Sequence, residues 1–338
     1  MEEILLLTVL LSAIITLIVL PKWIKKCHET SMLWENMNKY NHPKNLAASG
    51  GVVVVMAFVI AVLGYIAIRT FVIGDSDEIT IKIFSLLAVV LILSLVGLTD
   101  DLLGWKHGGL SKRVRLLLAF IAAIPLAVIN AGSHSINMPF FGLINIGLLY
   151  PLILIPLGIA GATTTFNFLA GFNGLEAGQG IIILSFLSFI SYITGSPWLS
   201  LIGLSMVASL IIFYFYNKYP AKVLPGDILT YAVGALIAIM AILGNFEKIA
   251  IFVFIPYLIE MILKLRGKLV IQSFGIPNKD ESLEMPYDKI YGWTHLSIWI
   301  LKKFKKKVYE KDVTYFIFAV QIILCLLALI IFKNYLFI

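Results

Sequence analysis

The chain has 338 residues, of which 60% are hydrophobic and 13% charged, and its net charge is +7 at pH 7. An ordinary soluble domain has about 25% charged residues, so this composition excludes a water-soluble globular protein and indicates one that is embedded in a membrane. The attraction of basic loops to anionic lipid headgroups accounts for the positive charge, and we expect no nucleic-acid partner.

Apolar runs recur along the chain. A helix needs about 20 residues to cross a hydrocarbon layer of about 30 Å. Runs near this length predict an all-α polytopic membrane protein with about ten transmembrane helices, folded as a single domain over residues 1–338. Two central runs are separated only by Gly195, Ser196 and Pro197, which predicts a tight helical hairpin. In chain order the predicted helices cover residues 3–20, 47–68, 79–99, 114–132, 143–163, 180–194, 197–215, 228–243, 249–265 and 313–332.

The basic residues predict the orientation of these helices. The first run has its positive cluster after it rather than before it, so we expect a retained helix with its N-terminus outside, and an even number of spans then leaves the C-terminus outside as well. All Lys and Arg residues except Arg69, Lys82, Lys248 and Lys333 lie in or beside the loops that this arrangement places inside, as the positive-inside rule requires. The predicted cytosolic loops are residues 21–46, 100–113, 164–179, 216–227 and 266–312.

Acidic residues are costly inside hydrocarbon and usually mark functional positions. Asp100 and Asp101 lie where the third predicted span ends, Glu176 lies in the third cytosolic loop, and Asp227 opens the eighth span. All four map to the cytosolic face. A transporter more typically carries such groups near the middle of the membrane. Only Glu260 in the ninth span is a candidate for this, and it lies near the inner end of that span.

The aspartate pair favours two roles over one shared role, because adjacent residues on a helix point about 100° apart. Charged residues are also common at helix ends, although carboxylates at a C-terminus oppose the helix dipole. The motif LPGD, which ends at Asp227, has a similar alternative. Asp227 falls where an N-cap is expected, and a capping carboxylate at the rim can also hold a metal ion.

The segment TTTFNFLAGFNGLEAGQG combines glycines with Asn167 and Asn173. Glycines let a backbone approach a ligand closely, and asparagine oxygens can complete the shell of a Mg²⁺ ion. The structural alternative is an interhelical turn whose small residues serve helix packing.

The last predicted loop is rich in basic residues. Arg266, Lys268 and Lys279 follow the ninth helix and could contact a diphosphate, whereas the run KKFKKK at 302–307 is typical of a stretch that binds a membrane surface. Oxygen ligands for a hard cation and positive charges for phosphates are thus predicted on one cytosolic rim. Metal-assisted phosphoryl transfer needs both.

Several motifs together resemble those of one enzyme family. The string NFLAGFNGLEAGQ is the most specific, and NMNK at 36–39, SGG at 49–51, GLTDDLLGW, LPGD and LEMPY at 283–287 support it. They resemble the polyprenyl-phosphate N-acetylhexosamine-1-phosphate transferases of glycosyltransferase family 4, and most of all the UDP-GlcNAc:dolichyl-phosphate GlcNAc-1-phosphate transferases. The resemblance runs from about residue 33 to 300 and implies a ten-helix membrane enzyme with a cytosolic active site.

This resemblance also implies roles for individual residues. Asp100 and Asp101 would be the catalytic pair, with Asp100 activating the lipid phosphate, and Asn167 and Asp227 would hold Mg²⁺ or Mn²⁺. The substrate-binding residues that it implies are Lys39, Arg115, Gly171, Phe172, Asn173, Gly174 and Glu176.

Two departures from the family pattern concern the last loop. The arginine- and histidine-rich motif of the eukaryotic enzymes is absent, so either Arg266, Lys268 or Lys279 binds the diphosphate in its place, or the donor is held differently. The multi-histidine motif of the peptidoglycan-precursor transferases is absent too, which argues against that substrate.

The expected reaction moves GlcNAc-1-phosphate from UDP-GlcNAc to a polyprenyl phosphate, by implication dolichyl phosphate, and releases UMP as the first membrane step of N-glycan assembly. A single displacement is preferred over an aspartyl-phosphate intermediate, although a carboxylate can also act as a nucleophile. The alternatives are a transferase for another UDP-HexNAc acting on undecaprenyl phosphate, and a nucleotide-sugar transporter. We further expect an integral protein in contact with membrane lipid, a homodimer, and an archaeal plasma membrane, the last on composition alone.

Overall fold

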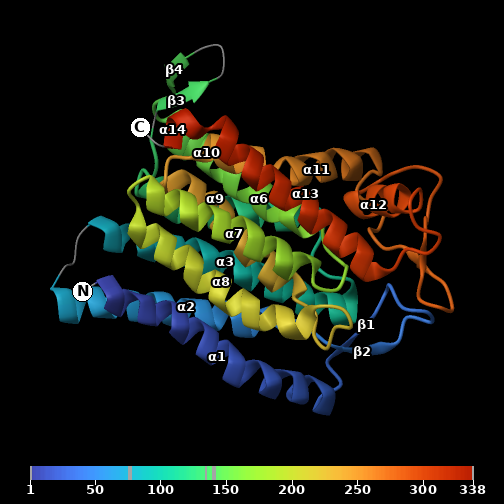
Figure 1. Cartoon of the computed structure of the whole chain (residues 1–338). Coiled ribbons are helices and arrows are strands. Elements are labelled where there is room, and N and C mark those ends of the chain that lie inside the picture. The colour runs from blue at the N-terminus through green and yellow to red at the C-terminus, as the bar shows by residue number, and fades with distance from the viewer. Residues whose placement is uncertain (1, 75–77, 134, 139–141, 337–338) are drawn as a thin grey trace.

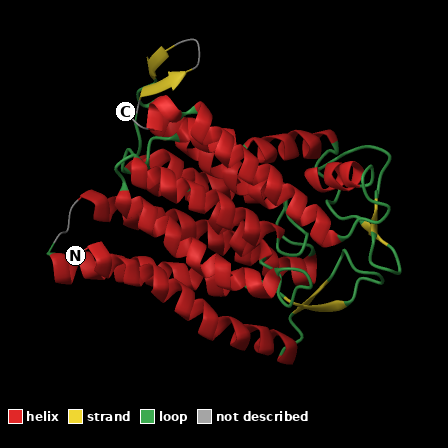
Figure 2. Cartoon of the chain, in the orientation of Figure 1, coloured by secondary structure: helices red, strands yellow, loops and turns green. Residues whose placement is uncertain are grey.

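The structure is a computed structural model that describes residues 2–74, 78–133, 135–138 and 142–336. In this part of the chain almost all regular structure is helical, and short strands occur only at the two ends of the helical bundle (Figure 2). The α-helices are α1 (Glu2–Glu29), α2 (Gly51–Ile68), α3 (Glu78–His107), α4 (Lys112–Ala122), α5 (Ile124–Val128), α6 (Ile155–Phe168), α7 (Leu175–Ile193), α8 (Pro197–Asn217), α9 (Gly226–Leu243), α10 (Glu247–Val253), α11 (Ile255–Arg266), α12 (Trp293–Leu301), α13 (Glu310–Ile331) and α14 (Lys333–Leu336).

Shorter elements join or extend these helices. The π-helical segment η1 (Arg69–Ile73) continues α2, and η2 (Tyr150–Leu154) leads into α6. The described strands form antiparallel pairs, which are β1 (Leu33–Glu35) with β2 (Lys44–Ala47), β3 (Ser135–Met138) with β4 (Gly142–Asn145), and β5 (Ile276–Pro277) with β6 (Leu283–Glu284).

Among the described residues, eight helices are long and apolar enough to cross a membrane. Helices satisfy all their backbone hydrogen bonds internally, as hydrocarbon requires. The predicted all-α, multi-pass membrane protein is therefore confirmed. These spans are Leu5–Glu29, Gly51–Ile73, Glu78–Gly104, Tyr150–Phe168, Leu175–Ile193, Pro197–Asn217, Gly226–Leu243 and Glu310–Ile331.

The other two predicted spans are each broken into two short helices. The run 114–132 becomes α4 and α5, which meet at Ala123 just before Pro125, and the run 249–265 becomes α10 and α11, which meet at Phe254 just before Pro256. Proline lacks an N–H group and is best tolerated in the first turn of a helix, and at both of these positions a new helix begins. Ten crossings, and an outside position for both termini, stay predictions.

Several predicted boundaries were wrong because the helices do not follow the apolar runs closely. Helix α1 continues to Glu29, α3 continues to His107, and α7 begins at Leu175, so these helices extend into the predicted loops 21–46, 100–113 and 164–179. Polar residues near the membrane surface extend a helix without extending its apolar run. The run 143–163 errs the other way, since its first residues form β4 and a turn at Gly147, whose φ is +58°.

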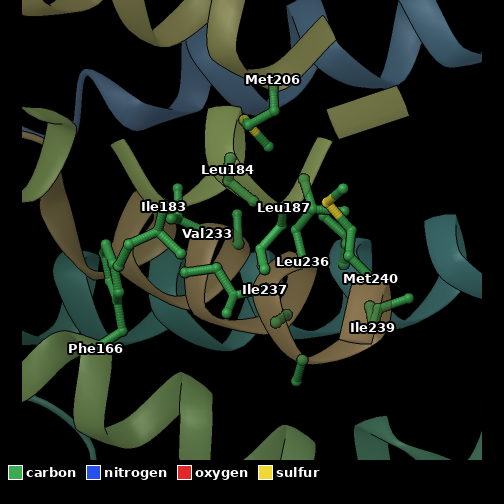
Figure 3. Packing of buried hydrophobic residues seen from close by; sticks show 14 of the residues in the cluster. Phe166, Ile183, Leu184, Leu187, Met206, Val233, Leu236, Ile237, Ile239 and Met240 are labelled. Carbon is green, nitrogen blue, oxygen red and sulfur yellow. The ribbon is translucent and has the colours of Figure 1, made fainter. Parts of the chain in front are cut away.

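Helix α9 lies at the centre of the bundle, where 89% of its residues are buried. Figure 3 shows its side chains Val233, Leu236, Ile237 and Met240 packed among residues of the neighbouring helices, including Phe166. The exposed leucines and isoleucines of α1 and α13, which are only 28% buried, are suited to contact lipid.

The first turn of α9 approaches α3 very closely at Gly97. A Cβ atom on Gly97 would lie 2.5 Å from the carbonyl oxygen of Asp227. Small residues allow such backbone contact between membrane helices. Asp227 therefore lies beside the end of α3, which carries Asp100 and Asp101. Both described chain ends lie at the end of the bundle opposite to α12 and the β1–β2 pair (Figure 1), and we call the end with α12 the site end.

Candidate functional site

A cavity of about 330 Å³ opens at the site end. This volume is in the range of small-molecule sites, about 300–1,000 Å³. Its wall combines the end of α3, the end of α6, the starts of α7 and α9, and the loop around β1. Among the predicted site residues, those that line it are Asp100, Asp101, Asn167, Gly171, Asn173, Glu176 and Asp227.

Arg115 on α4 joins two of the acidic residues. Its Nη1 atom donates to Oδ2 of Asp100 at 2.6 Å and to Oδ2 of Asp227 at 3.2 Å. The other oxygen of Asp100 accepts from the backbone N–H of Leu110 at 2.5 Å, because the turn at Gly109, with φ +78°, folds back over this carboxylate. One guanidinium thus holds two carboxylates that would otherwise repel each other.

Asp101 has a different set of partners from Asp100. Its carboxylate accepts from the backbone N–H groups of Asp227 at 2.8 Å and Ile228 at 3.4 Å, so Asp101 caps the start of α9. The expectation that Asp227 is the N-cap was wrong, because Pro225 occupies that position and Asp227 lies inside the first turn. Gly226 makes this contact possible, since its φ is +74° and a Cβ atom would lie 2.3 Å from Oδ2 of Asp101.

Asn167, at the end of α6, contacts Asp227 across the cavity wall. Its Nδ2 atom donates to Oδ2 of Asp227 at 3.1 Å, while its Oδ1 atom accepts from Thr230 at 3.1 Å. These are oxygen-bearing side chains of the kind that a hard cation prefers.

The described residues contain no group of three or more His, Cys, Asp or Glu side chains arranged to hold a metal. A Mg²⁺ ion that binds a phosphorylated substrate usually takes only one or two carboxylates, and water and phosphate oxygens supply the rest. Asp100 and Asp227 already share one cation, the Arg115 guanidinium, and Asn167 would add an oxygen if its amide turned over. The donor set therefore fits a divalent cation bound together with a substrate.

The glycine-rich segment forms another part of the cavity wall. The backbone N–H of Gly171, whose φ is +115°, donates to Oε1 of Glu176 at 2.7 Å. A Cβ atom on Gly171 would lie 2.5 Å from the ring of Phe274, so the close approach predicted for these glycines is occupied here by an aromatic ring. Gly174 precedes α7 with φ +82°, and Phe172 is buried behind the wall.

Two buried polar atoms of the cavity-lining residues have no hydrogen-bond partner among the described residues. They are Nδ2 of Asn173 and Oε2 of Glu176. A buried donor or acceptor without a partner costs about 1–3 kcal/mol. One donor and one acceptor beside a cavity are therefore suited to a ligand that carries both kinds of group.

Lys39 is engaged outside the cavity. Its ammonium donates to the hydroxyl of Tyr219 at 2.9 Å and forms an ion pair with Glu281. Burial disfavours the charged amine, but the hydrogen bonds to Glu281 and Tyr219 outweigh this effect, so the pKa of Lys39 is raised. The same ion pair lowers the pKa of Glu281. Lys39 thus ties the first loop to the last one.

The three basic residues expected to bind a diphosphate are not brought to the cavity. Arg266, Lys268 and Lys279 are exposed and do not belong to its lining, and the Arg266 guanidinium lies 5.6 Å from the ring centre of Tyr291. Arg115 is not part of the lining either, but its guanidinium pairs with two acidic residues that are, Asp100 and Asp227.

Sequence reasoning missed Phe274 as part of the wall. A buried polar group supports its segment, since Nζ of Lys264 donates to the carbonyl of Ile271 at 3.0 Å and to Ser273 at 2.6 Å. His295, interpreted as structural, is fully buried in the same region. Burial, and then the charge of Lys264, lower the pKa of His295 to about 4. A lone aromatic residue in a loop gives no signal of this role.

The fold and cavity define a multi-pass helical membrane protein with an acidic, arginine-bridged site at one end of its bundle. Residues 83–245 match the family described as glycosyl transferase family 4. A protein of Saccharolobus solfataricus is 33% identical over 308 residues, which are 90% of this chain and 90% of that protein. One of Sulfolobus acidocaldarius is 30% identical over 329 residues, 96% of this chain and 95% of that protein.

Both archaeal proteins are provisionally named UDP-N-acetylglucosamine–dolichyl-phosphate N-acetylglucosaminephosphotransferase. A protein of Dictyostelium discoideum with the same name, given without reservation, is 27% identical over 302 residues, 78% of this chain and 71% of that protein. The chain belongs to glycosyl transferase family 4. The family resemblance predicted from its motifs is confirmed.

Proposed function

We propose that this protein transfers GlcNAc-1-phosphate from UDP-GlcNAc to a polyprenyl phosphate, with dolichyl phosphate as the expected acceptor. The observation that carries the proposal is the meeting of Asp100, Asp227 and Asn167 at one cavity, with Arg115 bound to both carboxylates, in a chain of this family. The names of the relatives support the choice of substrates.

In the proposed reaction, an oxygen of the lipid phosphate bonds to the phosphorus that carries the sugar. The bond from this phosphorus to the bridging oxygen breaks, and UMP leaves with the electron pair. Both substrates are anions, so the site must supply positive charge. Arg115 supplies part of it, since a guanidinium can exchange its carboxylate partners for phosphate oxygens of similar geometry.

Asp100 is our choice for the group that accepts the proton of the lipid phosphate. Its carboxylate lies at the end of α3 and is bound by Arg115 and by the N–H of Leu110. A positioned carboxylate of this kind can act as a general base. Asp101, through its cap on α9, would keep Asp227 in position rather than contact the substrate.

We further propose that Asp227 and Asn167 hold a divalent cation, Mg²⁺ or Mn²⁺, beside the diphosphate. When bound, such a cation neutralises charge on the diphosphate. In the glycine-rich part of the wall, Nδ2 of Asn173 and Oε2 of Glu176 would bind polar groups of the uridine or the sugar. The site end would face the cytosol, as the distribution of basic residues predicts.

A substrate panel tests this proposal. Purified protein in detergent is given Mg²⁺, a polyprenyl phosphate and either UDP-GlcNAc or another UDP-HexNAc, and both UMP and lipid-linked sugar are measured. The proposal predicts equal amounts of the two products, the highest rate with UDP-GlcNAc, and no UMP without lipid phosphate. A higher rate with another UDP-HexNAc would mean that UDP-GlcNAc is not the preferred donor. Passage of UDP-GlcNAc into liposomes without UMP release would replace the enzyme with a transporter.

A further inference from the structure

Two buried polar side chains meet directly behind the glycine-rich wall. Asn38 follows β1, and Glu310 is the first residue of α13, so 272 residues of sequence separate them. Their exposed fractions are 2% and 1%, and neither belongs to the lining of the cavity. Any influence on a bound substrate must therefore act through other residues.

The contacts of this pair converge on the turn that carries Asn173. Oε1 of Glu310 accepts from Nδ2 of Asn38 at 3.1 Å and from the backbone N–H of Asn173 at 2.7 Å. The same Nδ2 of Asn38 donates to the carbonyl of Gly171 at 2.9 Å. Both ends of the turn from Gly171 to Asn173 are thus bound to one pair of side chains.

The pair also reaches the segment that carries Phe274. Oδ1 of Asn38 accepts from the backbone N–H of Gly275 at 3.4 Å. Phe274 packs against Gly171 on the cavity side. Asn38 therefore links the loop that carries Gly171 to the loop that carries Phe274.

A buried carboxylate is costly unless hydrogen bonds compensate for its lost hydration. Glu310 receives two such bonds, and both come from segments that form or support the cavity wall. Its Oε2 atom has no hydrogen-bond partner in the part of the chain that the structure describes. Supporting residues of this kind hold a binding group in one geometry, and so preserve affinity that a mobile loop would lose.

We propose that Asn38 and Glu310 are positioning residues that fix the turn from Gly171 to Asn173 for binding of the nucleotide-sugar donor. This inference rests on the proposed function. The pair sets where the free Nδ2 of Asn173 lies relative to Glu176. It acts on binding of the donor and not on binding of the lipid phosphate.

Steady-state kinetics of Glu310→Ala and Asn38→Ala test the proposal. A group that binds the donor equally in the ground state and in the transition state affects KM but not kcat. When such a group loses its position, KM rises and kcat stays unchanged. We expect the KM for UDP-GlcNAc to rise about tenfold in each variant, a loss of about 1.4 kcal/mol, while kcat and the KM for lipid phosphate change less than about twofold. Glu310→Gln keeps an acceptor oxygen, so it should restore most of the donor affinity.

A control on the same helix separates positioning from general stability. Gln321 on α13 is also fully buried, and its Nε2 atom donates to the carbonyl of Val253 at 2.8 Å. Gln321→Ala therefore removes a comparable buried hydrogen bond, about three turns from Glu310. We expect it to lower the melting temperature to a similar degree and to leave the KM for UDP-GlcNAc unchanged.

Two results would overturn the inference. One is an unchanged donor KM in folded Glu310→Ala and Asn38→Ala, and the other is an equal rise in Gln321→Ala. If the alanine variants do not fold, Asn38→Asp replaces them, and Glu310→Gln is the comparison that is expected to keep most of the donor affinity. Asn38→Asp sets a second carboxylate against Glu310 and should raise the donor KM, whereas an unchanged KM would contradict the positioning role of Asn38 and Glu310.

Failure of the proposed function has a separate signature. Stabilisation by UMP, measured as a shift of the melting temperature, needs no turnover. A wild-type protein that UMP does not stabilise and that forms no product contradicts the proposed function. If the wild-type protein binds UMP and forms product, and the Asn38 and Glu310 variants show the same KM for the donor, only the role of Asn38 and Glu310 is contradicted.

Discussion

At the scale of single residues, the site depends on how a few charges are shared. Arg115 binds Asp100 and Asp227 at once, and Asp101 caps the helix that carries Asp227. The adjacent aspartates thus differ in their contacts, as their 100° separation on a helix suggests. Each of these interactions can be removed separately, and each removal predicts a different result.

Replacing Arg115 with lysine tests the guanidinium bridge. Lysine keeps the charge but cannot bind two carboxylates or a phosphate through a planar fork. We expect Arg115→Lys to lower kcat/KM at least about tenfold, since hydrogen bonds to charged groups contribute about 1.5–3 kcal/mol. Arg113→Lys is the matched control, because Arg113 is exposed on the same helix. Equal activity in the two variants would show that the Arg115 guanidinium does not contribute to the reaction.

Gly226→Ala tests the cap on α9. The added Cβ atom would lie 2.3 Å from Asp101, and its φ of +74° disfavours any side chain. Gly195→Ala has the same backbone strain, since Gly195 has φ +82°, but it makes no clash, since an added Cβ atom there would meet no neighbouring atom within 4 Å. Activity and melting temperature should fall further in Gly226→Ala than in Gly195→Ala, for which only the backbone strain of about 1 kcal/mol is expected. Similar losses would mean that the contact with Asp101 is unimportant.

At the scale of elements, the position of the site depends on close contact between α3 and α9. This contact could not be predicted from the apolar runs, because they indicate helices but not which helices touch. Proline explains both broken helices, yet Pro21 lies inside an unbroken α1, so the residue alone does not decide where a helix ends.

Gly97→Ala tests the helix contact. The new Cβ atom would lie 2.5 Å from the backbone of Asp227, which cannot rotate away as a side chain can. We expect a loss of activity larger than the loss of stability, as Asp227 moves away from Asp100 and Arg115. Gly161→Ala on α6 adds the same methyl group where no atom lies within 4 Å, so it should be neutral or slightly stabilising. The comparison requires the activity of both variants to be measured with equal amounts of folded protein.

Helix α12 carries a group that makes stability depend on pH. The pKa of His295 is lowered to about 4 from its ordinary value of 6.5. Between these two values the unfolded chain binds a proton that the folded chain does not, so stability should decrease as pH falls from about 6.5 to 4, by about 1.4 kcal/mol per unit. Melting curves in detergent over this range should show the slope in the wild type and a weaker one in His295→Gln. A slope that is identical in both would exclude His295 as its source.

At the scale of the whole molecule, local patterns predicted the class of protein and most of its helices. Apolar runs and basic loops suffice for this, because hydrocarbon thickness and lipid charge act on each segment separately. Asp100, Asn167, Gly171 and Asp227, which were predicted as site residues, do line the cavity, whereas Arg266 does not. The sequence did not indicate that Phe274 lines the cavity or that Glu310 lies behind its wall, because these positions depend on contacts between segments far apart in sequence.

The most direct test of the central claim is lipid-dependent UMP release by site variants of the purified protein. Asp100→Asn and Asp227→Ala are compared with Asp280→Asn, which alters an acidic residue paired with Lys307 outside the cavity. If the cavity is the active site, UMP and lipid-linked GlcNAc are lost together in the first two variants and stay at the wild-type level in the third. Full activity in folded Asp227→Ala, or no UMP from the wild type with any UDP-HexNAc and lipid phosphate, would contradict the account.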